Sequence, residues 1–380
     1  MAHNVIIFAA VDNVGFSMGF ILVRIGLFQN INNLTLSNMS KTRVFYEAEK
    51  ARQTSLIEEG FFGPSEKGNG NFKGESYPFI LQQNNGVFNN LYEPIRGLAL
   101  SYFDENKISW WGGKLPTGHV LSSQIACVNH LMALRKDSVA VLALINGVRN
   151  QFKEVLPLPC DKDESYIAFE AVSKLQHLNE DGLTRGSNCT SVDALVYAVD
   201  NKGERWIIPI EWKYTESYDD CRSSDKSNEG ITYGIEPNSG KKPKGEVRFE
   251  RYSKLIEESE QLRSIPAFVD ASTNELRGSI YFYEPFYQLM RQTLWAEQMI
   301  KHRDIEAKHY MHIHIIPAND TDLLDKKYRP SKGNNMEDTW RACIVDQSKY
   351  VIVDPQQFMS PIKDMYPELW DYLSRRYFNI

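Results

Sequence analysis

Two apolar runs joined by a short turn constrain the fold of this chain most strongly. Residues Thr190–Val199 and Arg205–Thr215 are rich in Val, Ile, Tyr, Trp and Thr, the side chains that favour β-strands. Between them lies the turn cluster Asp200–Gly203, in which Gly203 can adopt the positive φ that a tight hairpin needs. The sequence therefore predicts an antiparallel hairpin, with a loop of either three or four residues.

The second strand of this hairpin ends on Glu211-Trp212-Lys213. Side chains two residues apart in a strand point to the same face, so Glu211 and Lys213 project together, away from Trp212. A three-residue loop would place Asp193 opposite Glu211, with their Cβ atoms roughly 5 Å apart, and a four-residue loop would shift this pairing by one position. In the favoured register Ser191 joins this polar face. The opposite face is apolar and collects Val192, Ala194, Val196, Ile208, Ile210 and Trp212. We expect one face to be core and the other to carry chemistry.

Opposed carboxylates repel each other unless a cation lies between them. Mg²⁺ prefers oxygen ligands, and Mn²⁺ can substitute for it, so Asp193 and Glu211 are candidate metal ligands. Lys213 could orient the attacking water or stabilise charge on the reacting phosphorus, and a depressed pKa would let it act as a base. This arrangement suits metal-assisted phosphodiester hydrolysis. The alternative is a solvated ion pair at the strand edge.

Four segments of the chain resemble the PD-(D/E)XK nuclease superfamily, in particular its bacterial restriction-endonuclease-like branch. They are Leu121–His130, Arg185–Ala194, Ile210–Glu216 and Tyr287–Gln292. The similarity extends from about Trp110 to the C-terminus, although Val192 stands where the nominal motif has Pro. The resemblance implies an α/β fold with a central mixed β-sheet flanked by helices. It also implies that Asp193 and Glu211 bind Mg²⁺ and that Lys213 is the catalytic lysine.

Other polar residues are candidates for the same site. Glu170 ends a probable neighbouring strand and is either a third metal ligand or a strand-end carboxylate. Gln124 lies on the first core helix, where it would hold a metal-bound water or make a cap or core hydrogen bond. Arg185 would contact phosphate or stabilise a turn. His312 and His314 share one face of a late strand, but without a third ligand they are weak evidence for zinc.

Composition is that of an ordinary globular enzyme, with 42% hydrophobic and 12% aromatic residues. The five cysteines are scattered without a Cys-x-x-Cys pair, which fits a reducing cytoplasm better than a disulfide framework. The formal net charge of −6 is the wrong sign for a nonspecific nucleic-acid coat, so local basic patches would have to make any contact with DNA.

Three parts of the chain are distinguished by their residue patterns. Residues 1–38 form an apolar segment of uncertain status, because translation could begin at Met39, and its charges disfavour a membrane helix. Residues 39–109 form a helical N-terminal extension, and residues 110–380 form the nuclease-like domain. Helices are expected at 41–59, 122–134, 138–153, 248–262 and 284–303. The long polar stretch from 217 to 245 is either a loop that closes over DNA or a solvated loop.

Together these observations predict a cytoplasmic, Mg²⁺-dependent deoxyribonuclease acting in restriction, defence or repair, and they leave open whether it is an endonuclease or an exonuclease. A homodimer, a partner methyltransferase and a defence-system subunit are left open as partners, and no membrane is expected. The alternative is a catalytically inactive nuclease fold that serves as a DNA-binding or assembly subunit. A glycosidase built on the same pair of carboxylates would not need Lys213.

Overall fold

The computed structural model describes residues 43–378, with gaps at 65, 73, 83–85, 112, 186–188, 219–243, 264–278, 329–330 and 332. Residues Val44–Ile380 belong to one compact unit. The apolar segment 1–38, and with it the question of a start at Met39, lies outside the described residues. So does most of the polar stretch 217–245.

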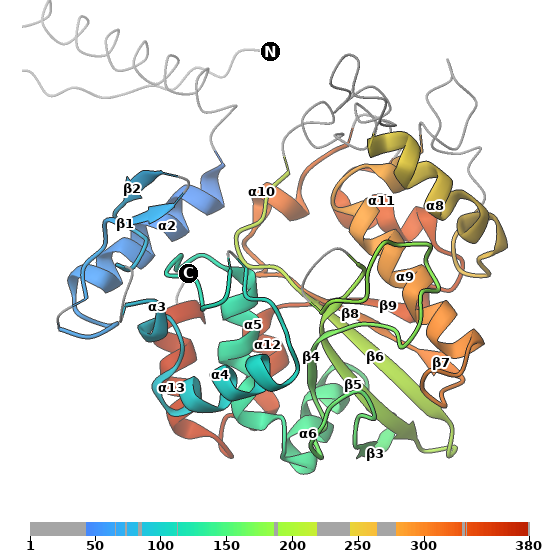
Figure 1. Ribbon diagram of the computed structural model, residues 1–380, viewed down its shortest axis with the longest axis horizontal. Helices are drawn as coiled ribbons and strands as arrows, with labels where there is room; N and C mark the ends of the chain where they lie inside the picture. Colours follow the sequence, from blue (N-terminus) through green and yellow to red (C-terminus); the bar gives the residue numbers. More distant parts are fainter. Residues whose placement is uncertain are drawn as a thin grey trace, which may run out of the picture. The chain divides into compact units, whose positions relative to one another are not determined.

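A mixed sheet of seven strands lies at the centre of this unit (Figure 1). The main path runs through five strands in the order β3 (Phe152–Leu156), β5 (Val192–Asp200), β6 (Arg205–Trp212), β8 (His312–Ile315) and β9 (Tyr350–Val353). Two further strands, β4 (Ala168–Ala171) and β7 (His309–Tyr310), pair with β5 and β6. The partners of β5 are antiparallel to it, whereas β6, β7, β8 and β9 pair in parallel. The predicted α/β fold with a central mixed sheet is confirmed.

The hairpin of β5 and β6 has the register of the three-residue loop. Ala194 pairs with Ile210 and Val199 with Arg205. Gly203 has a φ of 85° and donates its N–H to the carbonyl of Asp200 at 3.0 Å. Continued by one residue past the pair of Ala194 and Ile210, this register places Asp193 opposite Glu211.

Helices cover both faces of the sheet (Figure 1). One layer contains α4 (Arg96–Glu105), α5 (Ser123–Leu131), α6 (Ser138–Val148), α12 (Pro355–Met359) and α13 (Pro367–Leu373), whose apolar residues form one core with the sheet. The other layer contains α8 (Lys244–Glu258), α9 (Phe286–Lys301) and α11 (Met336–Cys343), which build a second core. Shorter or peripheral elements are α2 (Val44–Glu58), β1 (Gly70–Phe72), β2 (Glu75–Tyr77), α3 (Gly86–Asn89) and α10 (Thr321–Leu324). Single helical turns lie at Glu93–Ile95, Met132–Leu134, Ile280–Phe282, Gln347–Lys349, Ser360–Ile362 and Ser374–Phe378.

The expectation that one face of the hairpin is core and the other is chemistry is wrong. Ala194 and Trp212 pack into the first core as predicted, but Val192 packs into the second. Leu195 and Ile207 extend this second core beneath α9. The reason is that helices bury both faces of a mixed α/β sheet, so the polar site is a local interruption of an apolar face.

Element boundaries follow local hydrogen bonds. Ser122 caps α5 by accepting the N–H of Ile125 at 3.4 Å, as the sequence suggests. The helix predicted over 138–153 is too long, because α6 ends at Val148. The Asn146 side chain accepts the N–H groups of Gln151 and Phe152, which turns the chain into β3.

Within the part of the chain that the structure describes, no helix is long and apolar enough to cross a membrane.

Candidate active site

Glu211 and Lys213 form a buried ion pair at the end of β6. The Lys213 Nζ lies 2.7 Å from Glu211 Oε1, and the two residues are only 5% and 2% exposed respectively. Gln288 on α9 accepts from Lys213 at 2.6 Å and donates to the same Glu211 oxygen at 2.6 Å. Gln292, one helical turn later, donates to Glu211 Oε2. The pair is therefore not the solvated strand-edge pair that was the alternative.

Asp193 is tied to the same strand end across the hairpin. Its Oδ2 accepts the backbone N–H of Trp212 at 2.7 Å, which fixes the carboxylate beside Glu211. Burial, followed by the negative charges of Glu211 and Glu170, raises the pKa of Asp193 well above its ordinary value. Three carboxylates thus act on one another, and among the described residues no ion pair compensates the charge of Asp193 directly.

Glu170 approaches from β4 in an unusual backbone conformation. Its φ of 48° lies in the left-handed region, which a residue with a Cβ rarely adopts. The carboxylate accepts from Gln124 Nε2 at 2.8 Å and from Ser191 Oγ at 3.0 Å. Burial is the largest cause that raises the pKa of Glu170, and the charge of Glu211 adds to it. The candidate residues Gln124 and Glu170 are therefore hydrogen-bonded to each other, and the charge of Glu170 interacts with that of Glu211 on the hairpin.

Gln124 makes the core hydrogen bonds that were one of its two interpretations. Besides the contact with Glu170, its Oε1 accepts the N–H of Trp111 at 2.7 Å and its Nε2 donates to the Ser109 carbonyl at 3.3 Å. Whether it also holds a metal-bound water stays a prediction.

Lys213 is a charged ammonium in this arrangement, which is contrary to the idea that a depressed pKa makes it a base. Burial alone would lower the pKa of Lys213. The charges of Glu211, Tyr218, Glu216 and Asp193 together outweigh burial, and the pKa of Lys213 lies well above its ordinary value. Lys213 can donate hydrogen bonds and stabilise negative charge, but it does not accept a proton here.

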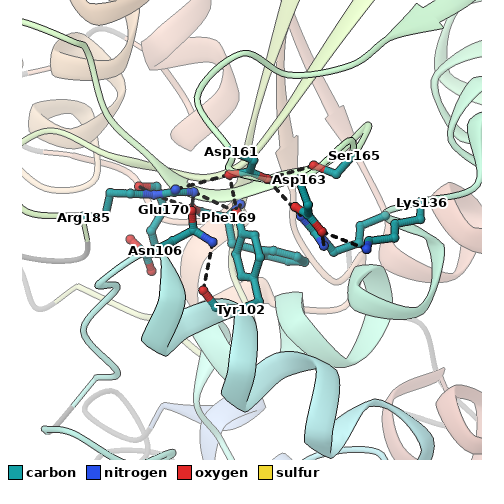
Figure 2. A network of polar contacts seen from close by, with 10 residues as sticks. Tyr102, Asn106, Lys136, Asp161, Asp163, Ser165, Phe169, Glu170 and Arg185 are labelled. Carbon is teal, nitrogen blue, oxygen red and sulfur yellow. Dashed lines mark hydrogen bonds and ion pairs between the residues drawn. The ribbon is translucent and has the colours of Figure 1, made fainter.

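A buried polar network holds the strand that carries Glu170 (Figure 2). The Arg185 guanidinium donates to the carbonyls of Phe169 and Glu170, and also to Asp161 at 3.2 Å and Tyr102 Oη at 2.8 Å. Tyr102 in turn donates to Asp161 at 2.8 Å. Arg185 is thus occupied with the backbone of β4, which agrees with the interpretation that it stabilises the local chain and not with a phosphate contact.

The two histidines of β8 are buried beside the site. His314 pairs with Glu211 in the parallel register of β6 and β8, and its Nδ1 lies 2.8 Å from Tyr350 Oη. Burial and then the charge of Lys213 lower the pKa of His312 to about 3, and the same causes lower the pKa of His314 well below its ordinary value. Both rings are therefore neutral at physiological pH, and no third zinc ligand accompanies them among the described residues.

Gln288 and Gln292 are the site residues that the sequence analysis missed. The sequence predicts a helix over 284–303 but assigns no site residue to it, and most of α9 is buried. The available signal was two glutamines four residues apart, which places both amides on one side of a helix. In the structure, this side of α9 contacts Glu211.

The carboxylate oxygens of this site are suitable ligands for a divalent cation, but they do not converge on one point. Among residues 43–378, outside the gaps, no three His, Cys, Asp or Glu side chains converge as a ready metal site. Asp193, Glu211 and Glu170 nevertheless offer hard oxygen atoms, and a cation would offset the burial and mutual repulsion that raise the pKa of Asp193 and Glu170. In this state Lys213, Gln288 and Gln292 occupy the oxygens of Glu211.

A comparison with known families identifies the chain. The model of the family described as "Restriction Endonuclease associating with ARP" matches residues 50–378. The chain belongs to this family. The match begins well before Trp110, so the restriction-endonuclease-associated family includes α4 and most of α2 along with the sheet. No curated protein and no solved structure matches the chain.

Proposed function

We propose that this member of the family is a nuclease of the PD-(D/E)XK type that hydrolyses DNA phosphodiesters with Mg²⁺. The observation that carries the proposal is the meeting of Asp193, Glu211 and Lys213 at one end of the β5–β6 hairpin. Two carboxylates and an ammonium in a buried setting are costly to stability. Such a cost is common where the groups perform chemistry.

Each residue has a definite chemical task in this proposal. Asp193 and Glu211 would hold the cation, with Glu170 as a further ligand, and Mg²⁺ when bound would polarise a phosphoryl oxygen and acidify a bound water. Lys213 would donate to the oxygens of the reacting phosphate, because its raised pKa keeps it protonated. Gln288 and Gln292 would hold Glu211 in position by hydrogen bonds from α9.

A second candidate is an assembly subunit without catalysis. It is favoured by the words "associating with ARP" in the family description, which point to a partner protein. It is also compatible with a Glu211 carboxylate whose oxygens are already occupied within the chain.

A cleavage assay separates the two candidates. The purified full chain is incubated with plasmid, linear and single-stranded DNA in Mg²⁺, in Mn²⁺ and in EDTA. Lys213→Ala is tested beside Lys308→Ala, which removes a surface lysine paired with Glu204 at the far end of the hairpin. We expect metal-dependent cleavage that is lost in Lys213→Ala and kept in Lys308→Ala.

Three other outcomes have clear meanings. Binding of DNA without cleavage in either metal would favour the assembly subunit. Equal cleavage by both variants would remove Lys213 from the mechanism. Failure to bind or cleave any of the three DNA forms would contradict the nuclease and any DNA-binding role of the assembly subunit.

A further inference from the structure

Two arginines flank one tyrosine ring beside the candidate active site. The guanidinium carbon of Arg248 on α8 lies 4.6 Å from the ring centre of Tyr287, and that of Arg291 on α9 lies 5.2 Å from it. Tyr287 itself is buried, so the ring serves as a fixed support for both cations. Contact with an aromatic face leaves the N–H groups of a guanidinium available for other partners.

The positions of Tyr287 and Arg291 on α9 place them beside the candidate catalytic residues. Tyr287 and Arg291 are four residues apart, as are Gln288 and Gln292, so the two pairs form neighbouring rows on the helix. The glutamine row binds Glu211. The row of Tyr287 and Arg291 therefore lies directly beside the proposed reaction centre.

Contacts with the start of β5 define this position further. Arg291 Nε donates to Thr190 Oγ1 at 2.9 Å, and Gln292 donates to the carbonyl of Ser191 at 3.3 Å. Thr190 and Ser191 precede Asp193 by only two or three residues. Arg291 is thus anchored on the segment that leads into the candidate metal ligand, and its side chain is still 23% exposed.

Among the residues that the structure describes, a single carboxylate lies within ion-pair distance of the two arginines. The nearest carboxylate to Arg291 is that of Glu180, at 3.6 Å, and Glu180 already accepts from Thr190 and from Tyr252. Arg248 has no carboxylate within ion-pair distance among the residues that the structure describes. Burial raises the pKa of nearby Glu284, and the charges of Lys213, Arg291 and Arg248 only oppose this effect.

We propose that Arg248 and Arg291 form a phosphate clamp that holds the DNA backbone next to the phosphodiester being cleaved. The proposal rests on the proposed nuclease function and adds the residues that recognise the substrate. A site with several carboxylates repels a polyanion, so binding requires cations close to the reaction centre. Guanidinium groups suit this task because their paired N–H groups match the oxygens of a phosphate.

Equilibrium binding of labelled DNA tests the clamp. Fluorescence anisotropy is measured in EDTA, so that no cleavage occurs, with single- and double-stranded DNA of equal length over a range of KCl concentrations. The proteins are the full-length wild type, Arg248→Ala, Arg248→Lys, Arg291→Ala and Arg205→Ala. Arg205 is a matched control, because it is an exposed arginine roughly 20 Å along β6 from Glu211.

We expect Arg248→Ala and Arg291→Ala each to weaken binding about 10-fold at low salt. Each should also reduce the slope of log K against log salt by about 0.9 on duplex DNA and about 0.7 on single strands. Arg248→Lys should keep the slope and lose part of the affinity, because a lysine retains the charge without the paired donors. Arg205→Ala should behave as wild type.

The results distinguish a failed clamp from a failed nuclease. If the wild type cleaves DNA but Arg248→Ala binds with unchanged affinity and slope, the clamp is wrong and the proposed function stands. If binding depends on both arginines but the wild type never cleaves in Mg²⁺ or Mn²⁺, the clamp is supported and the nuclease is wrong. Arg248→Ala keeps the test valid even if Arg291→Ala unfolds, because Arg248 makes no hydrogen bond to the described residues.

Discussion

Asp193→Asn should make the metal-free protein more stable at pH 8. The Asp193 carboxylate lies near Glu211 and Glu170, and burial together with their charges raises its pKa well above the ordinary value. Its contribution to stability is therefore present below the unfolded pKa of about 4 and is lost as the pH rises through the folded pKa. At pH 8 the wild type carries the full cost of an ionised Asp193. Asparagine removes the charge, and its side-chain oxygen can still accept the N–H of Trp212.

The size of the effect follows from the raised pKa. Each pKa unit corresponds to about 1.4 kcal/mol. With an unfolding entropy of about 2.1 cal/mol/K per residue over a compact unit of about 340 residues, this is roughly 2 °C in Tm per unit. Thermal unfolding is measured in EDTA at pH 8 and again near pH 4, where the gain should disappear. Adding Mg²⁺ or Mn²⁺ should raise the Tm of the wild type more than that of Asp193→Asn.

Two results would refute this reasoning. A lower Tm for Asp193→Asn than for the wild type in EDTA at pH 8 would mean that the carboxylate stabilises the fold. An equal response of both proteins to Mg²⁺ and Mn²⁺ would mean that Asp193 is not a ligand. Asp200→Asn, at the turn end of the same hairpin, is a control in which the carboxylate accepts several hydrogen bonds, so its loss should lower the Tm.

Three further predictions concern the neighbours of Asp193. Lys213→Ala should reduce cleavage about 10²- to 10³-fold and cost about 3–5 kcal/mol of unfolding free energy, since Glu211 is left buried without a counter-charge. The double variant with Glu211→Gln should recover stability, measured in urea, but not cleavage. Arg185→Ala should weaken Mn²⁺ binding by calorimetry, because it releases the backbone that orients Glu170, and Arg185→Lys should restore only part of it. His312→Phe should leave the pH profile of cleavage between pH 5 and 8 unchanged, because a pKa of about 3 keeps this ring neutral throughout; a shifted acid limb would count against it.

The hairpin was predictable because its information is local. A β-rich composition, a glycine able to take a positive φ and the period of two predicted the hairpin and narrowed its register to two choices, of which the structure has the one that places Asp193 beside Glu211. The burial of both sheet faces was not predictable from the hairpin. It depends on where α9 packs, and nothing in the sequence of β5 indicates that a helix about a hundred residues later covers it. For the same reason, the local sequence does not indicate that the side chains of Gln288 and Gln292 reach Glu211.

The conformation of Glu170 marks the limit of reasoning from local sequence. A left-handed glutamate costs roughly 1–3 kcal/mol and has no signature in Ala168–Ala171, which reads as an ordinary strand. The cost is offset by contacts that converge from distant positions, since Arg185 binds the backbone on one side while Gln124 and Ser191 bind the carboxylate. Arg185, which belongs to the network of Figure 2, thus holds the backbone of Glu170, while Gln124 and Ser191 hold its carboxylate near Glu211.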